Sequence, residues 1–96
     1  MPLLITYTEI RPSTAVNFIE ITAEDKQYLE DTYPTSTSTW SRTVSEDGLT
    51  RFLTVTYDNI SEFHQVMADP IAIEIGDRKM AACMAAGISR TMNITS

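Results

Sequence analysis

The stretch WSRTVSEDGLTRFLTVTY, residues 40–57, decides the predicted fold. On both sides of Asp47-Gly48, apolar or aromatic residues alternate with polar ones, which is the period of a β-strand. Asp-Gly is a frequent hairpin turn, because glycine adopts a positive φ at little cost. The sequence therefore predicts a strand within the Ser/Thr-rich residues 35–44, a turn at 45–48 and a returning strand over 49–57.

The segments outside the hairpin complete an alternating pattern of strands and helices. We expect a strand over 3–10, a helix from Thr22 to about Tyr33, a helix beginning after Asn59, a helix over 70–86 and a strand over 88–95. Residues 13–21 fit a helix, a strand or a loop. This order predicts the α+β class and a single ferredoxin-like βαββαβ domain over residues 1–96. Its sheet is antiparallel with four strands, both helices lie on one face, and the second helix is broken at Asp69-Pro70.

Helical spacing predicts which side chains of the second helix face the sheet. Before the break the predicted inner residues are Ile60, Phe63, His64 and Met67, and after it they are Ile73, Gly76, Met80 and either Cys83 or Met84.

The uncovered face of the sheet is predicted to be an interface. If Ser45 faces Leu49 across the turn, this face carries Trp40, Arg42, Phe52, Thr54 and Thr91. A sheet face open to water usually carries Lys and Glu, whereas this one is rich in hydroxyls and aromatics. We expect a second copy of the chain to cover it in a homodimer. The alternative is an open face on which Thr serves only as a good strand former.

Composition narrows the classes of partner and cofactor. The net charge of −6 opposes binding to nucleic acid or to an anionic membrane, and no apolar run approaches the length of a membrane span. The start of the chain lacks the pattern of a secretion signal, so a cytoplasmic protein is expected. One cysteine and one histidine cannot form a disulfide or a structural zinc site, and we expect neither a metal nor a cofactor. Cys83 lies among Ala and Met residues and is predicted to pack in the core.

The segment RFLTVTY (51–57), with Ile60, Phe63 and Asp69-Pro70, resembles the dimeric α/β-barrel group of ferredoxin-like proteins. That group includes antibiotic-biosynthesis-type monooxygenases, stress-responsive barrel proteins and short uncharacterised viral or metagenomic proteins. The resemblance implies a homodimer built through the sheet.

Several side chains are candidates for chemistry, although catalytic residues are otherwise unknown from the sequence. His64 is the only side chain with an ordinary pKa near neutrality and could act as a general base or haem ligand, or it could be a packed core histidine. Arg42 and Tyr7 are the other catalytic candidates. The trio of Trp40, Arg42 and Phe52 suits either a planar or carboxylate ligand or an interface.

These features predict a small homodimeric protein that either has no enzymatic activity or binds a small ligand in a cavity between sheet and helices. One alternative is a cofactor-independent oxygenase or isomerase for a planar small molecule, with His64, Tyr7, Trp40 and Arg42 lining the site. Another is a viral or scaffold interaction module. Whether the protein is an enzyme stays open at this point.

Overall fold

The computed structural model describes residues 2–95. Its elements are β1 (Leu3–Ile10), α1 (Ala23–Thr32), α2 (Pro34–Thr37), β2 (Ser41–Val44), β3 (Thr50–Tyr57), α3 (Ile60–Ala68), α4 (Pro70–Ala85) and β4 (Ser89–Thr95). The strands form one antiparallel sheet in the order β2-β3-β1-β4. The predicted α+β ferredoxin-like fold is therefore confirmed, including the helix break at Asp69-Pro70.

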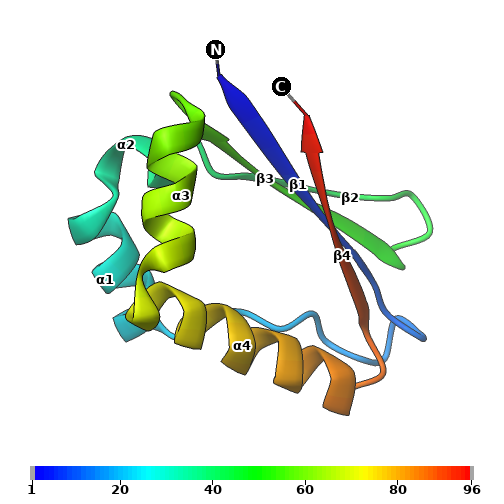
Figure 1. Cartoon of the computed structure of the whole chain (residues 1–96). Helices are drawn as coiled ribbons and strands as arrows, with labels where there is room; N and C mark the ends of the chain where they lie inside the picture. The colour runs from blue at the N-terminus through cyan, green and yellow to red at the C-terminus, as the bar shows by residue number, and fades with distance from the viewer. Residues whose placement is uncertain (1, 96) are drawn as a thin grey trace.

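All the helices lie on one side of the sheet (Figure 1). The N-terminal end of β1 and the C-terminal end of β4 lie close together at one edge of the molecule. The apolar core lies between the two layers. It joins the strand residues Leu3, Ile5, Val55 and Tyr57 to Phe63 and Val66 of α3. Tyr57 and Phe63 meet edge to face, with ring centroids 5.5 Å apart.

Charge is divided unusually between the two faces of the sheet. The face toward the helices carries Glu9, with Arg51 opposite it on β3 and Arg90 opposite it on β4. The other face, which we call the open face, has no charged side chain among residues 2–95 and is mostly Ser and Thr. Its residues are Leu4, Thr6, Thr8 and Ile10 of β1, Ser41 and Thr43 of β2, Thr50, Phe52, Thr54 and Thr56 of β3, and Ser89, Thr91, Asn93 and Thr95 of β4.

The register of the hairpin differs from the prediction by one residue. The Ser45 amide donates to the Thr50 carbonyl, so the loop spans residues 46–49 and Arg42 lies opposite Leu53 instead of Phe52. Asp47 closes this longer loop, because its carboxylate accepts hydrogen bonds from the Ser45 hydroxyl and the Leu49 amide. A shift of one residue exchanges the faces of a strand. Arg42 therefore lies on the helix-covered face, and its predicted place beside Phe52 is wrong.

The first part of the Ser/Thr-rich segment forms the helical turn α2, and only its last residues form the strand β2. Pro34 occupies the first position of α2, where a missing amide hydrogen costs nothing. Hydroxyls of the following residues donate back to main-chain carbonyls: Thr37 to Tyr33, Ser38 to Thr35 and Thr39 to Ser36. These local bonds give the backbone an alternative to a sheet ladder, so the strand is confined to residues 41–44.

Residues 13–21, whose structure the sequence leaves open, form a loop that contains no helix or strand. Two arginines hold it. Arg11 donates to the carbonyls of Gly48 and Val16, and the guanidinium carbons of Arg11 and Arg51 lie 4.5 and 4.8 Å from the centre of the Phe18 ring. This loop thereby brings Glu20 close to the sheet.

The predicted helix starts are confirmed, but the predicted inner residues are only partly right. The Thr22, Asn59 and Asp69 side chains accept the expected capping hydrogen bonds from main-chain amides. In α3 the buried residues are Phe63 and Val66, while Ile60, His64 and Met67 are exposed. In α4 they are Ile75 and Cys83, and Ile73 and Met84 are exposed. The two helices run in different directions on either side of Asp69-Pro70 (Figure 1), so they do not present one continuous inner face to the sheet.

Candidate functional site

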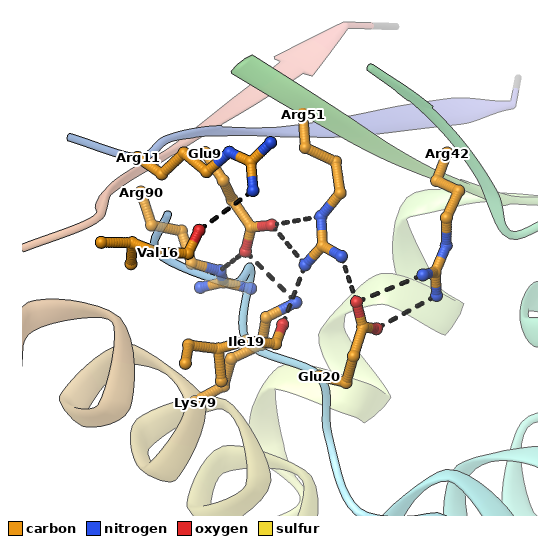
Figure 2. Close-up of polar contacts among 9 residues, drawn as sticks. All are labelled: Glu9, Arg11, Val16, Ile19, Glu20, Arg42, Arg51, Lys79 and Arg90. Carbon is orange, nitrogen blue, oxygen red and sulfur yellow. Dashed lines mark hydrogen bonds and ion pairs between the residues drawn. The ribbon is translucent and has the colours of Figure 1, made fainter. Parts of the chain in front are cut away.

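A cavity of about 770 Å³ lies between the helix-covered face of the sheet and the helices. This volume is within the range of small-molecule pockets. Much of its wall is apolar or aromatic, from Tyr7, Trp40, Leu53, Met67 and Ile75. Four of its charged lining side chains belong to one cluster, which we call the charged end: Glu20, Arg42, Lys79 and Arg90 (Figure 2).

Glu9 organises the charged end and is only 1% exposed. Its Oε1 accepts a hydrogen bond from Arg51 Nε at 2.8 Å and lies 2.7 Å from Arg51 Nη2. Its Oε2 lies 3.2 Å from Lys79 Nζ and 3.4 Å from Arg90 Nε. One buried carboxylate is thus surrounded by three cations, which come from β3, α4 and β4 (Figure 2).

Arg51 is the most heavily bonded of the three cations. Besides Glu9 it donates to the Ile19 carbonyl at 2.8 Å and forms an ion pair with Glu20. Glu20 also pairs with Arg42 at 3.2 Å, near the solvent. Burial alone would raise the pKa of Glu20, but the hydrogen bonds and charges of Arg51 and Arg42 together outweigh it and lower that pKa. These contacts tie the 13–21 loop to β2 and β3.

Lys79 and Arg90 differ from Arg51 because both line the cavity. Their side chains are 9% and 14% exposed. The Arg90 guanidinium carbon lies 4.2 Å from the centre of the Tyr7 ring, a cation–π contact. Burial lowers the pKa of Lys79, and the nearby Glu9 partly offsets that effect. Burial raises the pKa of Tyr7, so its hydroxyl stays protonated at neutral pH.

The cations of this cluster outnumber its carboxylates. Glu9 and Glu20 supply two negative charges, whereas Arg42, Arg51, Lys79 and Arg90 supply four positive ones. The excess is positive in a chain whose net charge is −6. Buried charges are stable only when paired, so this end of the cavity favours an anion.

The structure brings some of the predicted site residues together and separates others. Tyr7, Trp40 and Arg42 line the cavity. His64 is exposed on α3 and does not line it, so the four-residue oxygenase site predicted from the sequence is not assembled. Of the five residues predicted for the uncovered face, Phe52, Thr54 and Thr91 lie on the open face, and Thr54 also borders the cavity. The prediction is wrong for Trp40 as well as for Arg42, because the register shift places both at the cavity instead.

The sequence-based prediction missed Glu9 and Lys79. A signal for Glu9 was present, because it continues the alternation of Leu3, Ile5 and Tyr7 and so had to share their covered face. A charged residue on a buried face implies a partner. A signal for Lys79 was also present, because it lies one helical turn from Cys83, which is predicted to be buried, and so shares its face of the helix.

A second hollow, of about 450 Å³, lies where α1 and α2 meet α3. Its wall is mainly polar and includes Thr35, Asn59, Ser61, Glu62 and Gln65. It offers neither an apolar wall nor a buried charge cluster, so the larger cavity is the better candidate site.

Two further observations concern cofactors and membranes. Among residues 2–95, no group of three or more His, Cys, Asp and Glu side chains is placed to hold a metal ion. Cys83 is fully buried, as predicted, and burial raises the pKa of its thiol. In the described part of the chain, no helix has the length and apolar character to cross a membrane.

Comparisons with known proteins give one finding. No protein-family model matches the chain, and no curated protein matches it in sequence. One solved structure is similar in fold. It is a Deinococcus radiodurans protein named as a candidate antibiotic biosynthesis monooxygenase, with a TM-score of 0.46 and 13% identity over 97% of this chain and 90% of that one. At this identity the two proteins need share no site residue, so the chemistry of this chain follows from its own side chains.

Proposed function

We propose that the protein binds a small molecule with a planar, largely apolar body in the cavity between the sheet and the helices. The observation that carries the proposal is the cavity itself: about 770 Å³, lined by the apolar or aromatic Tyr7, Trp40 and Leu53 and by charged side chains such as Lys79 and Arg90. Binding sites commonly combine an apolar wall with a few convergent polar groups. Because His64 lies outside the cavity, the proposal is for binding and assigns no catalytic base.

Gly76 of α4 is a position at which a larger side chain would fill part of this cavity. It lies in the cavity wall, and a Cβ added there meets no atom within 4 Å. Gly76→Leu should fill part of the cavity while favouring the helix, since leucine is a better helix former than glycine. Gly76→Ala is the matched control, because it changes the backbone preference and adds only a methyl group.

The probe is N-phenyl-1-naphthylamine, an uncharged planar dye whose emission rises in apolar surroundings. Trp40 is the only tryptophan and lines the cavity, so bound dye should accept excitation energy from it. We expect saturable emission with transfer from Trp40 in the native protein and in Gly76→Ala, and at least about tenfold weaker binding in Gly76→Leu. Equal binding by all three proteins, or no binding by the native protein, would refute the proposal; circular dichroism verifies that each variant is folded.

We also propose that two copies of the chain pair through their open faces. What supports this is the absence of charge from that face, together with its half-exposed Leu4 and Phe52. Two copies, each with a net charge of −6, repel one another over the rest of their surfaces. The open face is where the two could meet without bringing like charges together.

A further inference from the structure

The hydrogen bonds of Glu9 are distributed unevenly between its two oxygens. Oε1 receives the Arg51 bond, whereas Oε2 has no hydrogen bond among residues 2–95 and only ion-pair contacts with Lys79 and Arg90. One oxygen of this carboxylate is therefore all that Lys79 and Arg90 share.

The donors on the cavity side are correspondingly short of acceptors. Arg90 Nε is buried and has no hydrogen-bond partner among the described residues. The Lys79 ammonium carries three N–H groups and lies near a single carboxylate oxygen. Unpaired buried donors cost free energy, and more so when they are charged. Both side chains line the cavity and keep a small exposed part, so an acceptor placed in it could reach the exposed N–H groups of Lys79 and Arg90, although Arg90 Nε itself is buried.

Among the described residues, no other group of the cluster is free to neutralise the positive charge of Lys79 and Arg90. An arginine does not lose its proton in a protein, and Arg90 is held against the ring of Tyr7. Glu20, the other carboxylate of the cluster, is engaged by Arg51 and Arg42. Lys26 and Glu30, the remaining charges of the wall, pair with each other at 3.8 Å. What the cluster lacks is one more negative charge beside Lys79 and Arg90.

We infer that the ligand of this cavity is an organic acid whose anionic group, a carboxylate or a similar monoanion, lies between Lys79 and Arg90 while its planar body lies along Tyr7 and Leu53. This inference rests on the proposed function and adds the chemical class of the ligand. Carboxylates suit the site, because guanidinium and ammonium groups form their strongest hydrogen bonds with ionised acceptors.

The inference is tested with two probes of the same shape, naphthalene-2-carboxylate and its neutral amide, naphthalene-2-carboxamide. Calorimetric titration at fixed ionic strength should show the acid binding at least about tenfold more tightly than the amide. Equal affinities would overturn the acid preference and leave the cavity proposal standing. Binding of neither probe would overturn the cavity proposal, and this inference with it.

Two variants locate the anionic group. Lys79→Met removes a cation beside Glu9, which keeps Arg51 and Arg90 as partners. Lys26→Met is the matched control, because it removes the same charge from the exposed part of the wall. We expect Lys79→Met to weaken acid binding about tenfold and to leave amide binding unchanged, whereas Lys26→Met changes either affinity less than about twofold. Equal losses of acid affinity in both variants would show only a general charge effect and contradict the placement.

Lys79→Met also has a readout that does not involve a ligand. If Lys79 is not needed to neutralise Glu9, the variant should melt at or above the temperature of the native protein, since Glu9 keeps Arg51 and Arg90 and one of three buried cations that share its carboxylate has been removed. A markedly lower melting temperature would show that Lys79 is needed to neutralise Glu9, which would contradict the inference.

Discussion

At the scale of single residues, Glu9 connects the two layers of the molecule. Its carboxylate contacts cations from two neighbouring strands and from α4, and through Arg51 it is linked to the 13–21 loop. Removing one member of a buried ion pair costs far more than removing an exposed one. The two carboxylates that pair with Arg51 allow this difference to be measured in one protein.

Glu9→Gln should lower the free energy of unfolding by about 3–5 kcal/mol, because three buried cations lose their shared carboxylate. Glu20→Gln is the control. Its carboxylate is half exposed, so its loss should cost about 0–1 kcal/mol. Urea unfolding of both variants measures the difference. Equal costs would mean that Glu9 does not organise the cluster.

Asp69 predicts a dependence of stability on acidic pH. Its Oδ2 accepts hydrogen bonds from the hydroxyls of Tyr33 and Tyr28, and with the amides of Ile71 and Ala72 these bonds lower the pKa of Asp69 to about 2. The unfolded pKa is about 3.9, so the stabilisation is fully present above it and is lost as pH falls toward 2.

The urea midpoint of the native protein should therefore decrease between about pH 4 and pH 2 more steeply than that of Asp69→Asn. Asparagine caps a helix as well as aspartate does, so the variant keeps the start of α4 while removing the titrating group. Parallel pH profiles for the two proteins would show that Asp69 is not stabilised in the folded state.

At the scale of elements, the sequence is informative wherever a local rule decides the structure. The strand alternation, the caps at Thr22, Asn59 and Asp69, and the positive φ of 75° at both Gly48 and Gly87 follow from such rules. The register of the hairpin does not, because Asp-Gly fits turns of more than one length and the Asp47 bonds select the four-residue loop. The one extra residue in the loop decides on which face of the sheet Arg42 lies.

The charge cluster shows the same limit. Alternation along β1 places Glu9 on the covered face, but its partners come from three other elements that only the assembled fold brings together. Local sequence patterns contain no information about such distant contacts.

Gly76 predicts a gain in stability at the element scale. It lies inside α4, and a Cβ added to it meets no atom within 4 Å, so alanine should fit without strain. Gly76→Ala should raise the free energy of unfolding by about 0.5–1 kcal/mol, because glycine is a poor helix former. Chemical denaturation measures this value. A loss of stability would show that the space beside Gly76 is filled.

At the scale of the whole molecule, the two faces of the sheet have opposite characters. The covered face carries the charges and the cavity, and the open face is uncharged. We expect ligand binding and self-association to be separate functions of separate faces.

Phe52→Lys should therefore convert the proposed dimer to a monomer, because it places a charge at an uncharged interface. Trp40→Ala should leave assembly unchanged, since Trp40 lines the cavity on the other side of the sheet. Sedimentation of the native protein and both variants separates one chain mass from two. A monomeric native protein, or dissociation only by Trp40→Ala, would contradict the pairing of open faces.

The most direct test of the central claim, that the cavity is a ligand site, is a nuclear magnetic resonance map of the native protein titrated with naphthalene-2-carboxylate. Shifts should be largest at Tyr7, Leu53 and Gly76 and at the Arg90 Nε–H, and smallest at Thr6 and Thr91 of the open face. Saturable shifts in that pattern are the predicted result. Shifts confined to the open face, or no saturable shift at the cavity residues, would contradict the account.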